Sequence, residues 1–418
     1  MIYRLLILFA FMLLIDFINH RARMLMFRRL KGSIIYKYIF ISYWGITVAI
    51  ILSLLISLLI TGLPELDYVK YRTYFTLFGI FMIFYFPRLI FIFFAFAQWI
   101  YYAFVNILNG RNSTKVARDN KKNYSIQNLG LIISFLFSFL VVYGMIWEKS
   151  NFKVSNIPVY IEDLPKSFEG FKIAQFSDVH LGSWHNAENV RKGLKLINSQ
   201  SPDIVFFTGD LVNNIVDEME PYLQDLKQIE APFGKYSILG NHDMSDYVKW
   251  KNFKLKQEYL NKLVRNEEDC GFKMLLNSNV ILKIKDDSIA LIGVENWGLP
   301  PFKQYGDLKK AMEGIENVNV KILLSHDPTH WQEKVVGKTD IDLTLSGHTH
   351  GMQMGIDFWG IRWSPIQWIY KHWFGLYQEK SQYLYVNPGF GFLGYPGRFG
   401  ISPEITILTL HKSNLKQK

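Results

Sequence analysis

The sequence of 418 residues contains a single cysteine, and this scarcity narrows the kinds of site it can build. One thiol, Cys270, excludes an internal disulfide and a cysteine-based metal site, both of which need several cysteines. It leaves the cellular compartment open. We also find no internal repeat and no low-complexity tract. Any metal site in this chain must therefore use histidine, carboxylate or amide ligands.

Acidic residues are also scarce, since 36 of them face 46 lysines and arginines for a formal net charge of +10. Much of this excess lies in two short loops between apolar segments, so we do not interpret it as a nucleic-acid footprint. Hydrophobic residues make up 50% of the chain, which is high for a soluble protein with this many charges. They lie mostly before Lys149, which predicts a membrane domain over 1–150 and a globular domain after it.

Four apolar runs precede the globular part, and we expect about four transmembrane helices there. They cover residues 5–18, 38–60, 73–108 and 129–147. The first run is short for a membrane span and contains Asp16. No small-residue cleavage site precedes His20 and Arg21, so an uncleaved anchor is favoured over a signal peptide.

The third run has two interpretations. As one helix it would be roughly 50 Å long, and the alternative is a hairpin that turns at Pro87-Arg88. Basic loops lie at 21–37 and 111–122. The positive-inside rule requires both loops to lie on the same side of the membrane, and only a single helix between them allows this. We therefore favour one long helix, in which Arg88 needs a partner or an interfacial position. For an arginine at such a position, snorkelling or packing is a more common role than forming a ligand site.

The same rule predicts the orientation of the chain. With both basic loops in the cytoplasm, the last helix exits on the far side of the membrane. The globular domain is then expected to be extracytoplasmic, and the lipid bilayer is an expected partner of the chain.

The globular part alternates strand-like and helical patterns, which predicts an α/β sandwich over 171–418. Residues 151–170 are interpreted as a polar lead-in, broken at Pro158 and Pro165. Helical spacing occurs at 189–197, 218–229 and 254–264, a hairpin is expected at 279–285 and 288–294, and closing strands at 383–387 and 404–410.

Five short motifs each follow a strand-like run and contain residues that can bind a metal. They are Asp178-x-His180, Gly209-Asp210, Gly240-Asn241-His242-Asp243, Ser325-His326 and Gly347-His348-Thr349-His350, after runs at 171–176, 204–208, 236–239, 321–324 and 341–345. The carboxyl ends of strands in an α/β sheet share one rim, where ligands bind. We therefore expect these side chains to lie close together.

Each motif alone has an ordinary structural explanation. A Gly-Asp pair is most often a turn, Asn241-His242-Asp243 suits a helix N-cap, and a histidine such as His326 is commonly a hydrogen-bonded structural residue. For three further histidines, His185, His330 and His372, we also favour an ordinary structural role, and a surface or pocket-rim role stays open. The five motifs in this order instead favour a two-metal phosphoesterase site, which needs one bridging carboxylate and a mixture of imidazole and oxygen ligands.

The ordered motifs resemble those of the calcineurin-like metallophosphoesterase superfamily, over about Ile157 to Leu410. Ser177, Gly351-Met352-Gln353 and Pro403-Glu404-Ile405 resemble its bacterial membrane-associated branch, some members of which act on UDP-2,3-diacylglucosamine-type lipid precursors. The resemblance implies an α/β/β/α sandwich and a hydrolase of phosphoric esters or pyrophosphates in the bacterial cytoplasmic (inner) membrane. It also implies a metal-bridging hydroxide as the nucleophile, without a covalent enzyme intermediate.

The resemblance also implies roles for individual residues. It assigns Asp178, His180, Asp210 and His350 to one divalent ion, and Asp210, Asn241, His326 and His348 to the other, with Asp210 bridging. It places His242 at the substrate phosphate, with Asp243 orienting it. Manganese is the first expectation for both ions, and the ligand types also accept iron, zinc, cobalt or nickel. Met352 departs from the family, which often has a glycine there.

The substrate is the least determined point. The stretch 358–398 is rich in tryptophan and tyrosine, which suits a membrane interface or an apolar pocket as well as it suits ordinary packing. Arg398 and Arg362 are candidates for contact with a substrate phosphate. With the membrane domain, these residues favour a lipid-linked or membrane-proximal phosphoester. The same chemistry on a nucleotide or phosphoprotein, or a non-catalytic membrane sensor, stays open, and nucleic acid is not expected.

Overall fold

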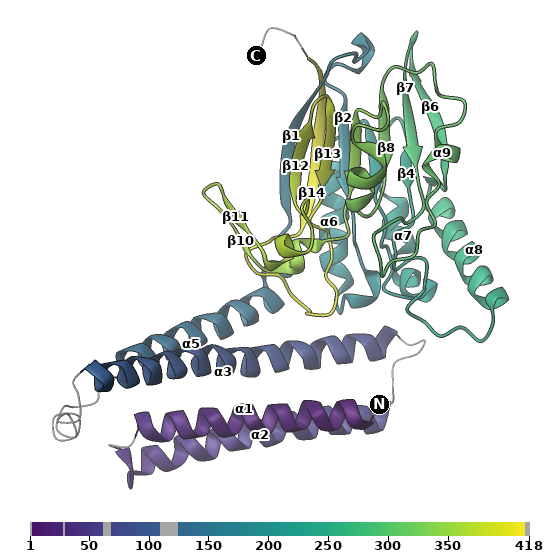
Figure 1. Ribbon diagram of the computed structural model, residues 1–418. Coiled ribbons are helices and arrows are strands. Elements are labelled where there is room, and N and C mark those ends of the chain that lie inside the picture. Colours follow the sequence, from purple (N-terminus) through teal and green to yellow (C-terminus); the bar gives the residue numbers. More distant parts are fainter. Residues whose placement is uncertain (1, 28–29, 62–67, 109–123, 414–418) are drawn as a thin grey trace. The chain divides into compact units, whose positions relative to one another are not determined.

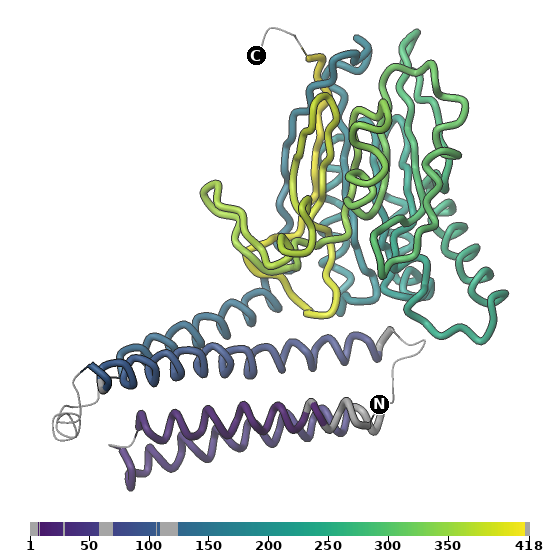
Figure 2. The backbone as a smooth tube through the Cα atoms, viewed as in Figure 1, coloured from purple at the N-terminus to yellow at the C-terminus, as the bar shows by residue number. Residues whose placement is uncertain are grey.

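The structure is a computed structural model that describes residues 2–27, 30–61, 68–108 and 124–413. The chain divides into two compact units, which Figure 2 traces by residue number. The first comprises residues 1–63 and 76–143, and the second comprises 64–75 and 144–418.

The first unit is helical. Its helices are α1 (Ile2–Met26), α2 (Ile34–Thr61), α3 (Tyr68–Leu108) and α5 (Ser125–Ile146), of which the ends of α3 and α5 extend into the second unit. Among the described residues, three stretches are long and apolar enough to cross a membrane: Ile34–Ser57, Lys70–Val105 and Ser125–Ser150. Helix α1 is not one of them, so a fourth span stays a prediction.

Helix α3 passes through Pro87 without a turn, which confirms the single long helix and rules out the hairpin. Proline has no amide hydrogen, so the carbonyl of Ile83, one turn earlier, loses its usual helical donor. The hydroxyl of Ser138 on α5 donates to that carbonyl at 3.1 Å, and Ser134 donates to the carbonyl of Pro87 at 2.8 Å. These hydroxyls compensate the helix backbone at the point where the proline interrupts it.

Arg88 finds its partner inside the helical unit. Its guanidinium pairs with the carboxylate of Asp16 on α1, and both residues are buried. The hydroxyls of Tyr43 and Tyr85 donate to the same carboxylate at 2.7 and 3.0 Å. Arg88 therefore belongs to a buried polar cluster that joins α1, α2 and α3, and it does not snorkel.

The second unit contains two six-stranded sheets that pack face to face (Figure 1). In order across the first sheet the strands are β1 (Lys153–Ile161), β14 (Glu404–Lys412), β2 (Lys172–Phe176), β3 (Ile204–Phe207), β4 (Lys235–Ser237) and β5 (Phe272–Met274). The second sheet has β12 (Gly375–Glu379), β13 (Gln382–Val386), β9 (Leu343–Ser346), β8 (Lys321–Leu324), β7 (Asp287–Gly293) and β6 (Ser278–Ile284).

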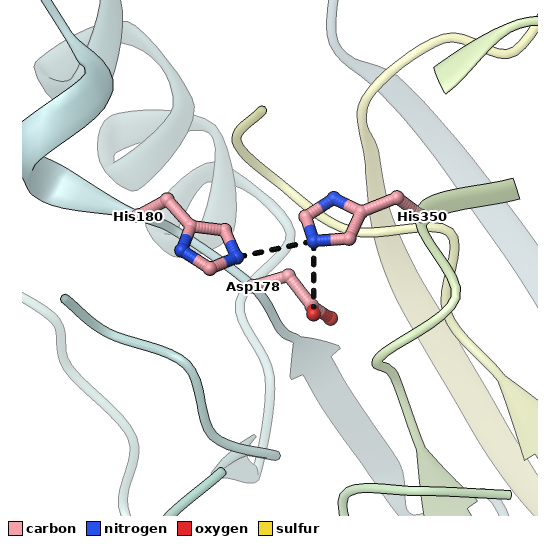
Figure 3. Close-up of side chains that lie close together, drawn as sticks. All are labelled: Asp178, His180 and His350. Atoms are coloured by element: carbon pink, nitrogen blue, oxygen red, sulfur yellow. Dashed lines mark hydrogen bonds and ion pairs between the residues drawn. The ribbon is translucent and has the colours of Figure 1, made fainter. Parts of the chain in front are cut away.

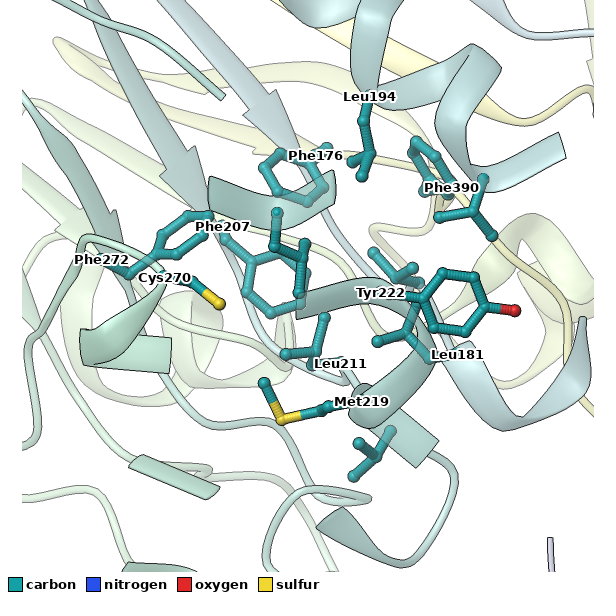
Figure 4. Close-up of a cluster of buried hydrophobic side chains, with 14 of the residues drawn as sticks. Phe176, Leu181, Leu194, Phe207, Leu211, Met219, Tyr222, Cys270, Phe272 and Phe390 are labelled. Atoms are coloured by element: carbon teal, nitrogen blue, oxygen red, sulfur yellow. The ribbon is translucent and has the colours of Figure 1, made fainter. Parts of the chain in front are cut away.

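Helices cover the outer faces of both sheets, as expected for an α/β/β/α sandwich. They are α6 (Ala187–Ser199), α7 (Leu223–Lys227), α8 (Phe253–Asp269) and α9 (Leu308–Ala311). Alternation along β3 shows how the layers form, because Phe206 packs between the sheets and Phe207 packs outward under the helices. Figure 4 shows this outer cluster, where Phe207 lies beside Phe176 and Phe272.

The prediction of a polar lead-in over 151–170 is wrong, because β1 (Lys153–Ile161) lies within that range and pairs with β14 in parallel. Pro158 lies within this strand. A proline cannot donate a ladder hydrogen bond, but β1 is at the edge of the sheet, where one side of the backbone needs no partner. The predicted helix at 218–229 is also shorter, since a 3₁₀ turn (Val216–Tyr222) containing Pro221 precedes α7.

Candidate metal centre

The predicted ligands follow the carboxyl ends of strands that run in parallel within each sheet. Strands β2, β3 and β4 pair in parallel in one sheet, and β8 and β9 pair in parallel in the other. The loops after these strands hold the ligands: Asp178 and His180 after β2, Asp210 after β3, Asn241 after β4, His326 after β8, and His348 and His350 after β9. The two facing sheets therefore bring all seven side chains to one rim of the sandwich.

Five of these residues have left-handed backbone conformations. The φ angles are 56° for Asp178, 49° for His180, 61° for Asp210, 72° for His348 and 51° for His350. Such conformations cost a non-glycine residue about 1–3 kcal/mol each, and they persist where the surroundings force them, often at functional sites. Five such residues at one rim indicate that the fold maintains unfavourable backbone conformations in order to orient these side chains.

The first ligand group consists of Asp178, His180 and His350, shown in Figure 3. The two Nε2 atoms of the histidines lie 3.1 Å apart, and that of His350 lies 3.2 Å from Oδ1 of Asp178. Two nitrogens that each sit about 2.0–2.1 Å from one ion are roughly 3 Å apart. The three side chains therefore converge at the spacing that a shared metal ion requires.

The second group consists of Asp210, His326 and His348, joined by the amide of Asn241. Nδ1 of His348 lies 3.3 Å from Nε2 of His326 and 2.8 Å from the side-chain oxygen of Asn241. Nε2 of His326 lies 3.2 Å from Oδ2 of Asp210. These four donor atoms are also close enough together to hold one ion.

Asp210, a member of the second group, also lies beside the first. Its Oδ2 lies 3.2 Å from Nε2 of His326 and 3.7 Å from Nε2 of His180, so a single carboxylate faces a ligand of each set. The backbone amide of His242 donates to its other oxygen, Oδ1, at 2.8 Å, which fixes the carboxylate plane. The bridging role of Asp210 stays a prediction, which its place beside both groups fits.

The pKa values of the histidines follow from burial and from Asp210. Burial lowers the pKa of His180 to about 3 and that of His350 well below its usual range, so both rings are neutral near pH 7. Burial also opposes a charge on His326, but the Asp210 carboxylate outweighs it and raises that pKa to about 10. A positive charge is therefore favoured beside the Asp210 carboxylate, as expected at a candidate cation site.

Two glycines permit the close packing around the ligands. A Cβ atom on Gly347 would lie 2.0 Å from Oγ of Ser177 and 2.3 Å from Oδ2 of Asp178. A Cβ on Gly240 would lie 2.2 Å from Oδ1 of Asp210. Both positions must therefore lack a side chain. Met352, where the family often has glycine, keeps a left-handed φ of 56° and still leaves the seven ligand positions in place.

Asp243 has a different role from the predicted one. Its carboxylate accepts hydrogen bonds from the backbone amides of Gly240, Asp210, Leu211 and Val212, and so binds together the loops after β3 and β4. The prediction that Asp243 orients the His242 ring directly is wrong for this reason. It acts on the loops that position the ring, and not on the imidazole.

The His242 ring is held by the loop after β3 instead. Its Nδ1 lies 2.6 Å from the carbonyl oxygen of Asn213. A carbonyl only accepts, so this nitrogen carries a proton and Nε2 is the one left for exchange with a substrate. The ring lies against His180, with centroids 4.9 Å apart, and is partly exposed, so a substrate can reach it.

Glu218 organises this loop, although no sequence motif marks it. Its buried carboxylate accepts hydrogen bonds from the amides of Gly182, Asn213, Asn214 and Ile215. Glu218 was assigned to a helix, and a buried glutamate that binds backbone amides leaves no pattern in a sequence. The residue connects the loop after β2 with the carbonyl that holds His242.

The arginines predicted to contact a substrate lie elsewhere. Arg398 is fully buried behind the first ligand group, where it donates to the carbonyls of Gly391 and Pro388 and approaches Nδ1 of His350 at 3.3 Å. That prediction is therefore wrong, because these donors are already used inside the protein. Arg362 lies on a small hairpin, where it pairs with Asp357 at 3.3 Å and lies over the Phe374 ring. It is not in contact with the ligand groups.

Aromatic side chains border the second ligand group. The hydroxyl of Tyr370 lies 2.8 Å from Nε2 of His348, and the ring of Phe302 lies 4.8 Å from the same histidine. The ring centroids of Tyr247 and His242 lie 4.6 Å apart, and the Tyr247 hydroxyl accepts a hydrogen bond from the Asn241 amide. The interpretation of His330 as a structural residue is confirmed, because it is buried and bonded to Ser325 at 2.8 Å.

Comparison with known families agrees with this geometry. The family described as calcineurin-like phosphoesterase matches residues 171–352, which contain all seven predicted ligands. A second family, described as probable calcineurin-like phosphoesterase, transmembrane domain, matches residues 3–149. The two matches correspond to the globular and apolar parts of the chain.

Related proteins occur in bacteria and animals. The chain is 34% identical over 259 residues to the uncharacterized metallophosphoesterase YkuE of Bacillus subtilis, covering 60% of this chain and 82% of that protein. It is 28% identical over 295 residues to a zebrafish transmembrane protein with metallophosphoesterase domain, covering 68% of this chain and 62% of the fish protein. The alignment thus spans less than two thirds of the fish relative.

Proposed function

The chain belongs to the calcineurin-like metallophosphoesterases, and from this membership we propose that it is a membrane-anchored two-metal hydrolase of a phosphoric ester or pyrophosphate. The observation that supports two ions is the position of Asp210. Its Oδ2 lies 3.2 Å from His326 and 3.7 Å from His180, one ligand of each group. A structural site for one ion would need only one of these groups.

The proposed reaction exchanges one phosphorus–oxygen bond for another. Two divalent ions, when bound, would supply a reactive water-derived nucleophile at neutral pH and stabilise charge on the phosphoryl oxygens. The chain itself holds the seven ligands in place, with Asp210 between the groups. The bond to the leaving oxygen breaks as the bond to the water oxygen forms, and the leaving oxygen then needs a proton.

His242 is placed to provide that proton. Because Nδ1 donates to the carbonyl of Asn213, Nε2 is the ring nitrogen that is left to deliver a proton to the leaving oxygen. The ring lies against His180 of the first group, so a phosphoryl group at the ions would be within its reach. Loss of the imidazole should slow the departure of a poor leaving group more than that of a good one.

For the substrate we propose a lipid-linked or membrane-proximal phosphoester. Two features support this choice: the match of residues 3–149 to a transmembrane phosphoesterase domain, and the aromatic border formed by Tyr370, Phe302 and Tyr247. Aromatic rings suit a substrate with an apolar portion near its phosphate. For the metal we propose manganese, which carboxylate and mixed nitrogen and oxygen ligands accept.

For the location we propose a multi-pass protein of the cytoplasmic membrane with an extracytoplasmic catalytic domain. The basic loops before α2 and after α3 support this orientation by the positive-inside rule. A periplasm-active reporter fused after Lys418 should be active. A reporter that is active only in the cytoplasm would contradict the orientation and leave the chemistry untouched.

The activity is tested with the purified full chain, added manganese and two substrates, bis-p-nitrophenyl phosphate and a diacylated UDP-sugar. We expect metal-dependent hydrolysis that Asp210→Asn abolishes and that Asp286→Asn, the same change at an exposed turn, preserves. Faster turnover of the lipid would support the lipid-linked substrate, and turnover of the generic ester alone would contradict it. Bound metal without hydrolysis of either compound would favour the sensor hypothesis.

A further inference from the structure

A small hairpin in the second unit exposes large apolar side chains. It consists of β10 (Ile356–Phe358) and β11 (Ile361–Trp363), joined by Trp359 and Gly360, and it projects from the sandwich in Figure 1. Trp359 is 89% exposed, and the adjacent Phe358 and Ile361 are 63% and 64% exposed. Just after the hairpin, Trp368 and Ile369 are 75% and 73% exposed. We call these five residues the aromatic tip.

The backbone conformation of this turn is energetically unfavourable for the residues that form it. Trp359 and Gly360 have φ angles of 49° and 79°, and such a two-residue turn normally uses asparagine or aspartate followed by glycine. A tryptophan in the left-handed region is an unfavourable choice. Its ring stacks only on the neighbouring exposed Phe358, at 4.9 Å and 15°, so no burial in the domain offsets the strain. Packing within the sandwich therefore does not explain why a tryptophan occupies position 359.

The hairpin lies at the end of the second unit where the chain leaves its last apolar stretch. That stretch, Ser125–Ser150, is followed directly by β1, and Lys153 at the start of β1 pairs with Asp357 of β10 at 3.0 Å. A second connection runs through the loop before β14, since Arg398 donates its amide to the carbonyl of Gly144 at 3.2 Å. The neighbouring Phe399 exchanges backbone hydrogen bonds with Gln353 and Gly355, just before β10.

These contacts tie the hairpin to residues 144–150, the last part of a stretch that is apolar enough to span a bilayer. Trp147, 58% exposed, lies in this part, as tryptophans commonly do at the boundary between lipid and water. Residues 144–150 and the hairpin belong to the same unit, and the tryptophans and isoleucines of the tip have the composition of an interfacial anchor.

We infer that the aromatic tip inserts into the interface of the bilayer that anchors the chain. The hairpin thereby holds the catalytic unit against the lipid surface. The same segment continues to Tyr370, whose hydroxyl contacts the metal ligand His348 at 2.8 Å, so it connects the lipid surface with the metal centre. Insertion needs no hydrolysis, so it can be tested whether or not the chain turns over a substrate.

The test uses the full chain in vesicles of phosphatidylcholine and phosphatidylglycerol. An environment-sensitive nitrobenzoxadiazole dye is attached to Trp359→Cys, or to Asp286→Cys as the control. Asp286 lies in the exposed β6–β7 turn, and the next residue, Asp287, bonds the amide of Ser167, beyond the end of β1 opposite to Lys153. The unmodified chain, whose Cys270 is buried, gives the labelling blank.

We expect the dye at 359 to emit at shorter wavelength and to lose intensity when the vesicles contain phosphatidylcholine with a nitroxide on its acyl chain. The dye at 286 should respond only to iodide in the water. Equal iodide quenching at both positions, without quenching by the lipid nitroxide, would overturn the inference. A shorter emission wavelength at 359 without lipid quenching would indicate a protein partner or second copy, and would overturn it as well.

A second labelled position guards against a dye that inserts by itself. With the dye on Ile361→Cys, quenching by the lipid nitroxide should be strong when Trp359 is present and should be largely lost in Trp359→Glu. Unchanged quenching in Trp359→Glu would show that the native tip does not drive insertion.

Discussion

Nδ1 of His242 lies 2.6 Å from the carbonyl oxygen of Asn213, so a backbone group, and not a carboxylate, fixes this ring. The carbonyl is in turn fixed because the amides of Asn213, Asn214 and Ile215 all donate to the buried carboxylate of Glu218. Glu218 is thus a positioning residue that acts on His242 through the loop. It reaches neither ligand group.

Glu218→Gln should lower kcat while leaving metal content unchanged. The amide keeps one acceptor oxygen and replaces the other by a donor that faces backbone amides, so the loop shifts. A displacement of about 1 Å at a catalytic group can cost roughly 100-fold in rate. Glu220→Gln, at an exposed neighbouring glutamate, is the matched control and should behave as wild type. Loss of bound metal in Glu218→Gln would show that the residue supports the ligands instead.

Glu218 should also make stability depend on pH. Burial raises the pKa of Glu218 to about 7, above the usual value of 4.5. The folded chain therefore holds this proton more tightly than the unfolded chain, so the contribution of Glu218 is present below pH 4.5 and is lost as the pH rises to about 7. In Glu218→Gln, the free energy of unfolding should fall less over this range. An identical pH profile in both proteins would contradict the shift.

Gly347→Ala should prevent the first ligand group from binding a metal ion. The added Cβ would lie 2.0 Å from Ser177 and 2.3 Å from Asp178, distances that real Cβ atoms do not reach, so Asp178 must move. We expect metal content and activity to fall together, as measured by elemental analysis and ester hydrolysis. Gly45→Ala, where a Cβ meets open space, is the control. Full metal occupancy in Gly347→Ala would contradict the packing described for this loop.

Arg88→Met should destabilise the helical unit because it leaves Asp16 buried without its cation. Breaking a buried pair from one side typically costs about 3–5 kcal/mol, whereas replacing both partners by apolar residues is often neutral. Thermal unfolding in detergent should therefore show a large loss for Arg88→Met and substantial recovery in Arg88→Met with Asp16→Leu. Lys37→Met, at an exposed position, is the control. If the double variant were no more stable than the single one, the prediction would be contradicted, and Asp16 and Arg88 would have a role beyond pairing with each other.

The ligands could be predicted because their residue types and order are visible in the sequence. Each stands just after a strand whose apolar run is readable, and Lys321–Leu324 was predicted with its observed bounds. The edge strand β1 was missed because Pro158 and its polar neighbours resemble a loop, and only its pairing with β14 makes it a strand.

The residues that support the ligands were harder to predict. Their partners are backbone groups, such as the carbonyl of Asn213 or the amides bound by Asp243 and Glu218. Backbone groups are the same at every position, so a sequence cannot show which of them a side chain will meet. Arg398 was misassigned for a related reason, because its burial depends on carbonyls that fold around it.

The central claim is that Asp210 joins two metal ions, and electron paramagnetic resonance of the manganese-loaded full chain tests it most directly. Two ions bridged by one carboxylate couple their spins, so we predict two manganese ions per chain and a spin-coupled spectrum. Asp210→Asn should lose the coupling, while Asp286→Asn should retain it. A wild-type spectrum of isolated manganese ions, or one ion per chain at saturation, would contradict the account.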